Sequence, residues 1–166
     1  MRYKKPVSVL VVIHTPGLEV LLLERALHPG FWQSVTGSQD EGETLEETAR
    51  REVAEETGIV AASGQFLPWH IANRFEIFAE WRHRYAPGVT HNVEHVFSLA
   101  LPAAPPVRLA PGEHSAFRWL PWREAAAVCF SWSNRDAILM LPSYPSFTTP
   151  SCKPSRCCAG WRTPRS

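Results

Sequence analysis

The segment from Gly37 to Ile59 constrains this chain more than any other part of its sequence. Its residues follow the pattern G-x5-E-x7-R-E-U-x-E-E-x-G-U, in which U is a bulky aliphatic residue and x is any residue. With roughly 5–7% usage for each specified residue type, a chance match in one chain is on the order of 10⁻⁷. The pattern is therefore strong evidence for a specialised site, and its glutamates indicate the chemistry of that site.

Residues 43–57 of this segment are expected to form an α-helix, because they are dense in Glu, Ala and Arg. Thr44 precedes Glu47 by three positions, as in a capping box, and Gly58 is a typical helix stop. At about 3.6 residues per turn, three acids of this helix fall within roughly 100° of arc, bordering its apolar stripe. These acids are Glu52, Glu55 and Glu56.

Three like charges at the edge of a core repel one another and lose hydration, so they need a cation or raised pKa values. A hard divalent ion with oxygen ligands supplies this compensation, and magnesium is the usual choice where phosphates share the coordination sphere. The alternative is a solvated, Glu-rich helix face, which the periodicity and the complete pattern disfavour. Arg51 lies close in sequence to Glu43 and Glu55, so we expect it to pair with a carboxylate and fix its rotamer.

Composition limits the remaining possibilities. A chain of 166 residues with 45% hydrophobic positions is long enough for one packed domain. A net charge of +1 argues against binding to a nucleic acid polymer or an anionic membrane. The longest apolar run, 7–13, is far shorter than the roughly 20 residues of a membrane span. Cys129 stands alone in the body, without a disulfide framework, which favours a reducing cytoplasm.

Alternating and apolar runs predict several strands around the helix, with further helices near the end of the chain. The expected strands are 7–13 and 20–23, joined as a hairpin through a Thr-Pro-Gly turn, then 59–61, 66–71, 75–80, 94–101 and 116–120; the later helices are 122–128 and 134–140. This order favours a mixed sheet covered by helices on both faces. We expect residues 1–141 to form the domain.

Residues 142–166 change to Pro, Ser, Thr, Cys and Arg without periodicity, which predicts a disordered tail. The alternative is a metal site formed by Cys152, Cys157 and Cys158. Their spacing lacks the C-x-x-C pairing of most zinc sites, so this alternative is disfavoured.

The pattern in 37–59 is similar to the signature of the Nudix family. The resemblance implies an α/β fold, an α/β/α sandwich with a mixed sheet, and a hydrolase that splits phosphoanhydride bonds. It implies magnesium, with manganese as a substitute, bound by Glu52, Glu55 and Glu56. The carbonyl oxygen of Gly37 would be another ligand.

Four further segments resemble one bacterial branch of that family, which converts dihydroneopterin triphosphate to the monophosphate and pyrophosphate in folate synthesis. They are FWQSVTGS (31–38), FEIF (75–78), RHRYAPGVT (82–90) and SWSNR (131–135). This resemblance, over about residues 4–140, implies that Glu113 joins the metal site and that Lys4 and Arg25 contact the triphosphate. It implies a substrate pocket lined by Thr36, Phe75, Glu76, Ile77, Phe78 and Ser131.

Several alternatives stay open at this stage. The base that takes a proton from the attacking water is Glu56, Glu113 or Glu52. The substrate is the pterin triphosphate or a nucleoside triphosphate such as dATP, and a non-catalytic binding module is a third hypothesis, although all the carboxylates of the pattern are present. The phosphorus attacked, the number of metal ions and the choice between monomer and homodimer are also open.

Overall fold

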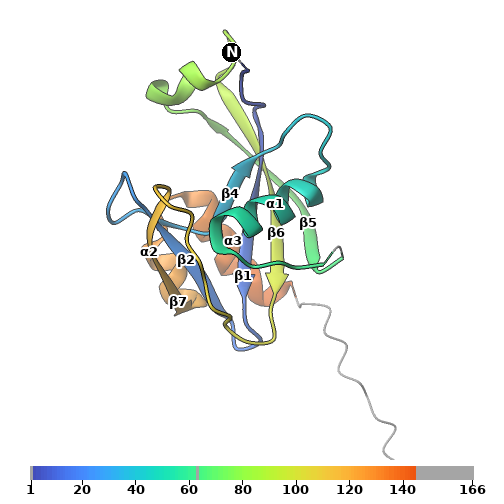
Figure 1. Ribbon diagram of the computed structural model, residues 1–166, viewed down its shortest axis with the longest axis vertical. Helices are drawn as coiled ribbons and strands as arrows, with labels where there is room; N and C mark the ends of the chain where they lie inside the picture. Colours follow the sequence, from blue (N-terminus) through green and yellow to red (C-terminus); the bar gives the residue numbers. More distant parts are fainter. Residues whose placement is uncertain (1, 63, 145–166) are drawn as a thin grey trace, which may run out of the picture.

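The computed structural model describes residues 2–62 and 64–144, which fold around one mixed sheet (Figure 1). The strands are β1 (Val7–His14), β2 (Glu19–Arg25), β3 (Trp32–Gln33), β4 (Val35–Ser38), β5 (Phe66–Glu76), β6 (His91–Ala100) and β7 (His114–Pro121). The helices are α1 (Leu45–Thr57), η1 (Ala79–Arg84), α2 (Trp122–Val128), α3 (Trp132–Met140) and η2 (Leu141–Ser143), of which η1 and η2 are 3-10 turns. The expected α/β sandwich is confirmed.

The strand order is β3-β2-β1-β6-β5, while β4 pairs with β1 and β7 pairs with β2. β1 runs parallel to β6, and the other pairs are antiparallel. β1 is buried along almost its whole length because helices cover both faces of the sheet. Val9 and Val11 pack in the core beneath α1, and Leu10 and Val12 pack in the core beneath α2 and α3.

α1 begins at Leu45, two residues later than expected, because Thr44 is its N-cap. The Thr44 side chain accepts a hydrogen bond from the Glu47 amide at 3.2 Å, and the Glu47 carboxylate accepts one from the Thr44 amide at 2.7 Å. Gly58 ends the helix in the left-handed region, at φ 72°. Val53 and its neighbours on one helix face are fully buried against β1, which holds the carboxylates at the rim of the core.

The strand predictions need four corrections. Residues 59–61 form no strand: Ile59 and Ala61 are apolar because they fill the core beneath α1, without a sheet partner. Segments 66–71 and 75–80 belong mostly to one strand, β5, whose register with β6 shifts between Pro68 and Ala72. Residues 79–80 begin η1 instead. The short strands β3 and β4 were not predicted, and β4 takes the edge of β1, so the expected hairpin of β1 and β2 pairs only at its turn.

Ordered contacts continue just beyond residue 141, where the domain is expected to end. α3 ends at Met140, η2 follows, and the ring of Tyr144 stacks on Trp69 with centroids 4.3 Å apart. The rest of the expected tail, residues 145–166 with its three cysteines, lies outside the described residues. Among the helices of the described ranges, none is both long and apolar enough to cross a membrane.

Candidate active site

Gly37 of β4 lies directly against the Glu52 side chain of α1. A Cβ atom at Gly37 would lie 1.9 Å from the Cδ atom of Glu52 and 2.0 Å from its Oε1 atom. A side chain at position 37 is therefore incompatible with this position of the Glu52 carboxylate. The glycine of the pattern lets the carboxylate lie against the backbone of β4.

Arg51 joins the loop before α1 to the carboxylates on the helix. Its Nε donates to the Oε1 atom of Glu43 at 2.6 Å, its Nη1 to the Oε1 atom of Glu52 at 2.8 Å, and its Nη2 to the carbonyl oxygen of Ser38 at 3.0 Å. The hydrogen bond from Arg51 is the main reason that the pKa of Glu43 falls to about 2. The structure thus places Arg51 against carboxylates, as the sequence predicts.

Glu52 is a largely buried carboxylate, with 13% of its side chain exposed. Burial raises its pKa to about 7, the hydrogen bond from Arg51 opposes that rise, and the charge of Glu56 adds to it. Glu55, by contrast, is 59% exposed and lies 3.3 Å from the Nη1 atom of Arg51. Of the three acids expected to face one site, Glu52 and Glu56 are sheltered and Glu55 lies at the exposed margin.

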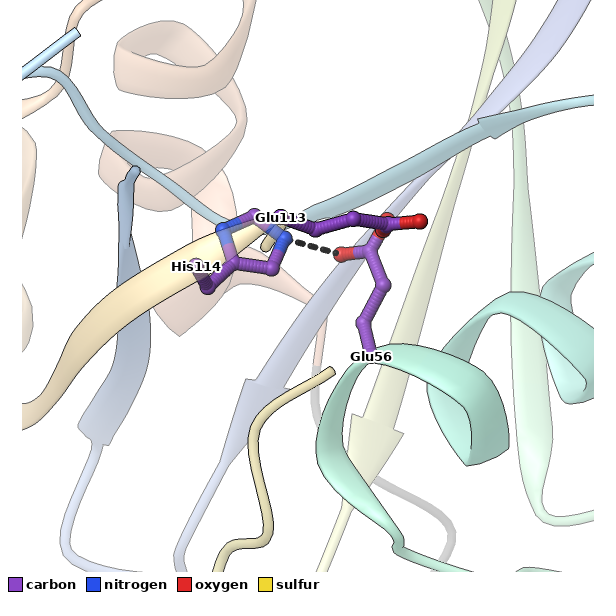
Figure 2. A group of neighbouring side chains, drawn as sticks. All are labelled: Glu56, Glu113 and His114. Atoms are coloured by element: carbon purple, nitrogen blue, oxygen red, sulfur yellow. Dashed lines mark hydrogen bonds and ion pairs between the residues drawn. The ribbon is translucent and has the colours of Figure 1, made fainter. Parts of the chain in front are cut away.

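Glu56, Glu113 and His114 form a second group beside the end of α1 (Figure 2). One potential ligand atom from each lies within 4.8 Å of the other two. The Nε2 atom of His114 is 3.2 Å from the Oε2 atom of Glu56, and both side chains are buried. The Glu113 carboxylate points toward that of Glu56 (Figure 2). The loop before β7 thus folds back to α1, as the sequence-based prediction for Glu113 requires.

Burial raises the pKa of Glu56, and the hydrogen bond and charge of His114 oppose that rise without cancelling it. Burial lowers the pKa of His114, but the hydrogen bond and charge of Glu56, together with a backbone hydrogen bond to Glu24 and the charge of Glu113, outweigh burial, so the net shift is upward. Each group therefore stabilises the charged form of the other. His114 is a residue that the sequence analysis missed, although it directly follows Glu113.

This donor set fits a divalent cation. Glu52 and Glu56 are sheltered carboxylates with raised pKa values, and Glu113 adds a third negative charge nearby. Hard cations such as Mg²⁺ prefer carboxylate and carbonyl oxygens. A hydrogen bond from an outer residue commonly orients a ligating carboxylate, and His114 is placed to do this for Glu56.

Arg25 is positioned beside this acidic group by the pairing of β2 with β7, in which it lies opposite His114. Its guanidinium lies 5.1 Å from the ring centroid of Trp81, and that of Arg84 lies 6.0 Å from the same ring. Burial lowers the pKa of Arg25, and the neighbouring charge of Arg84 lowers it further. An anion between these two cations would relieve their repulsion. Trp81 and its contact with Arg25 were not predicted.

Lys4 lies next to Arg84 in space, since its amide donates to the Arg84 carbonyl oxygen at 2.9 Å. Together with Ser38, Arg51 and Glu52, Lys4 lines a cavity of about 270 Å³. Glu56, Glu113 and His114 lie outside this cavity. Lys4 therefore lies near Glu52, and Arg25 lies near Glu56 and His114.

The expected pocket residues divide into two groups. In the first group, Thr36 and Phe75 lie on the face of the sheet that α3 covers. Ser131 is the N-cap of α3. Ile77, two residues after Phe75, is buried. Two others are exposed around η1. Glu76 pairs with Arg82, and Phe78 makes an edge contact with Trp81, with centroids 5.2 Å apart.

The fold agrees with the comparisons with known proteins. The NUDIX domain matches residues 4–141, and the chain belongs to that family. It is similar to the dihydroneopterin triphosphate diphosphatase of Escherichia coli K12, with 50% identity over 139 residues that cover 82% of this chain and 91% of the relative. The enzyme of that name from Haemophilus influenzae is 39% identical over 143 residues, covering 83% of this chain and 88% of the relative. The solved structure of the E. coli dihydroneopterin triphosphate pyrophosphohydrolase matches with a TM-score of 0.75 and 49% identity, covering 83% of this chain and 95% of that one.

Proposed function

We propose that this chain hydrolyses dihydroneopterin triphosphate to dihydroneopterin monophosphate and pyrophosphate, a step of folate biosynthesis. The observation that carries the proposal is the grouping of Glu56 and Glu113 with His114, with Glu52 one helical turn before Glu56, in a chain 50% identical to a diphosphatase of that name. The intact carboxylate set also argues against a binding module without catalysis. A cytoplasmic location fits the free thiol of Cys129, and the enzyme would act as a monomer or homodimer.

Glu52, Glu56 and Glu113 would hold magnesium, or manganese in its place, with Glu55 and the carbonyl oxygen of Gly37 as further ligands. When bound, the cation would neutralise charge on the phosphate chain and lower the pKa of the attacking water. The high pKa of Glu52 and Glu56 in the chain alone supports this assignment, because two sheltered carboxylates gain most from a nearby cation.

The residues around the carboxylates would bind the substrate and move one proton. Arg25 would bind phosphate oxygens through two N–H groups of its guanidinium. Lys4 would act as a point charge from the cavity that it lines with Glu52. The base that takes the proton from water would be Glu56 or Glu113. We favour Glu56, because His114 holds its carboxylate and stabilises its charged form. Glu52 would then serve as ligand, since Arg51 already occupies its Oε1 atom.

A steady-state comparison of dihydroneopterin triphosphate with dATP, followed by pyrophosphate release at a fixed magnesium concentration, tests the proposal. We expect kcat/KM for the pterin to exceed that for dATP by at least about tenfold. Glu56→Gln should lower turnover on both by orders of magnitude, because a neutral amide binds Mg²⁺ poorly. Glu124→Gln, on the exposed face of α2, is the matched control and should have no effect. A preference for dATP would instead support the general nucleotide pyrophosphohydrolase.

A further inference from the structure

A buried polar group lies on the sheet face opposite α1 and takes no part in the proposed chemistry. Glu94 on β6 is 6% exposed, and Asn92, two residues earlier on the same face, is 4% exposed. Ser8 on β1 lies opposite Glu94 in the parallel pairing of the two strands. A glutamate at such a position is unusual, because an ionised carboxylate is rarely buried without a cationic partner.

These buried groups have unused hydrogen-bonding capacity. Within the described residues, the Glu94 carboxylate accepts one hydrogen bond, from the Ser133 hydroxyl at 2.8 Å. The Asn92 amide donates to the Ser8 hydroxyl at 2.7 Å, but its Oδ1 atom has no partner. Burial raises the pKa of Glu94, because one hydroxyl donor does not replace the lost hydration. The group is therefore rich in acceptor atoms and short of N–H or O–H donors.

The strand register places this group among the expected pocket residues. Residues that lie opposite each other on paired strands point to the same face. Asn92 lies opposite Phe75, so the acceptors and this aromatic side chain share one face. Ser133 belongs to the first turn of α3, whose N-cap is Ser131. Glu94 thus lies between Phe75 on the neighbouring strand β5 and the start of α3.

β4 connects this face to the candidate metal site. Gly37 touches Glu52 on the α1 side of the strand, whereas its neighbours Thr36 and Ser38 share the opposite face with Leu10 and Ser8. In the pairings of the described residues, β4 has a neighbour on one side only, namely β1. From β4 across β1 to β6 is two strand spacings, or roughly 10 Å. A ring bound at Glu94 is thus within reach of phosphates bound near Glu52.

We propose that Glu94 is the specificity-determining residue for the ring of the substrate. Its carboxylate accepts hydrogen bonds from the ring N3–H and the 2-amino group of a pterin, and the Asn92 Oδ1 atom offers a further acceptor beside it. This inference rests on the proposed function. Two parallel N–H donors match the two oxygens of a carboxylate, and the guanine ring carries the same edge. Adenine presents a bare acceptor nitrogen there, which a carboxylate repels, so Glu94 would select against dATP.

Glu94→Gln tests this assignment, because glutamine keeps the size of the side chain and an acceptor for Ser133 but places an amino group against the ring donors. We expect kcat/KM for dihydroneopterin triphosphate to fall at least about 100-fold, as expected when a buried polar site no longer matches its substrate. The value for dATP should stay unchanged or rise, since the carboxylate that repels the adenine nitrogen is removed and the residues that act on the phosphates are untouched. Glu124→Gln is again the control.

Binding of phosphate-free neopterin, followed by its fluorescence, separates ring recognition from hydrolysis. The unaltered protein should bind neopterin at least about tenfold more tightly than adenosine, and Glu94→Gln should abolish that preference. If neopterin binds in this way but the triphosphate is not hydrolysed, the proposed function fails while the role of Glu94 stands. Equal affinity for neopterin and adenosine in the unaltered protein would overturn the inference. An equal loss of kcat/KM on both triphosphates in Glu94→Gln would also overturn it. That result is expected if Glu94 only stabilises the fold through its hydrogen bond with Ser133 of α3.

Discussion

Replacing Gly37 by alanine tests whether the position of the Glu52 carboxylate controls catalysis. The new Cβ atom would lie 1.9 Å from the Cδ atom of Glu52, and an ordinary contact begins at 3.4 Å. The carboxylate must therefore retreat by about 1.5 Å, the difference between these distances. Misplacing a reacting or binding group by about 1 Å costs on the order of 100-fold in rate. We expect kcat to fall by about this factor and half-maximal activity to require more magnesium.

The fold should tolerate this substitution, because Gly37 does not have a positive φ and the obstructing atoms belong to a side chain that can rotate. The assay is kcat as a function of magnesium concentration, with the melting temperature measured in parallel. Gly17→Ala is the control, since the nearest atom to its Cβ would be the Thr15 hydroxyl at 4.0 Å. A folded Gly37→Ala protein with unchanged kcat and magnesium dependence would refute the argument.

Three further predictions concern the carboxylates and the end of the chain. Glu113→Gln should lower kcat at least about 100-fold with a much smaller change in KM, and a normal kcat would identify Glu113 as a solvated loop acid. The folded pKa of Glu52 is raised to about 7, so the metal-free protein binds more protons than the unfolded chain at intermediate pH. The free energy of unfolding of the metal-free protein should therefore fall as pH rises from about 4.5 to about 7. Denaturant titrations in a chelator should show a shallower fall for Glu52→Gln. The same dependence on pH in both proteins would contradict the raised pKa of Glu52. Deleting residues 145–166 should leave kcat unchanged, because every proposed site residue precedes Tyr144, and loss of activity in a folded truncated chain would show otherwise.

Local signals in the sequence were sufficient for α1. The capping box at Thr44 and the stop at Gly58 depend on neighbouring residues, and both occur as predicted apart from the exact first residue. Strand boundaries depend on partners far away in the chain. Ile59 resembles a strand residue because it is aliphatic, yet its burial comes from packing beneath α1. The short strand β4 has its partner in β1, which no pattern within residues 35–38 reveals.

The same distinction applies to the site. Glu52 and Glu56 follow from helical periodicity, and the contact of Arg51 with Glu43 follows from their closeness in sequence. His114 meets Glu56 only because β2 and β7 pair in one particular register and bring the preceding loop to α1. The only sequence signal for His114 was that it directly follows Glu113, which was expected at the metal site. Nothing local distinguishes Glu94 from an ordinary strand residue, since its burial depends on α3.

The central claim is cleavage of a triphosphate with release of pyrophosphate at the glutamate cluster. Phosphorus-31 NMR of dihydroneopterin triphosphate incubated with the enzyme, with magnesium or with a chelator, tests it most directly. The account predicts equal amounts of dihydroneopterin monophosphate and pyrophosphate, formed only with magnesium and lost in Glu56→Gln. Release of inorganic phosphate with a diphosphate product, or an undiminished rate in the chelator, would contradict it.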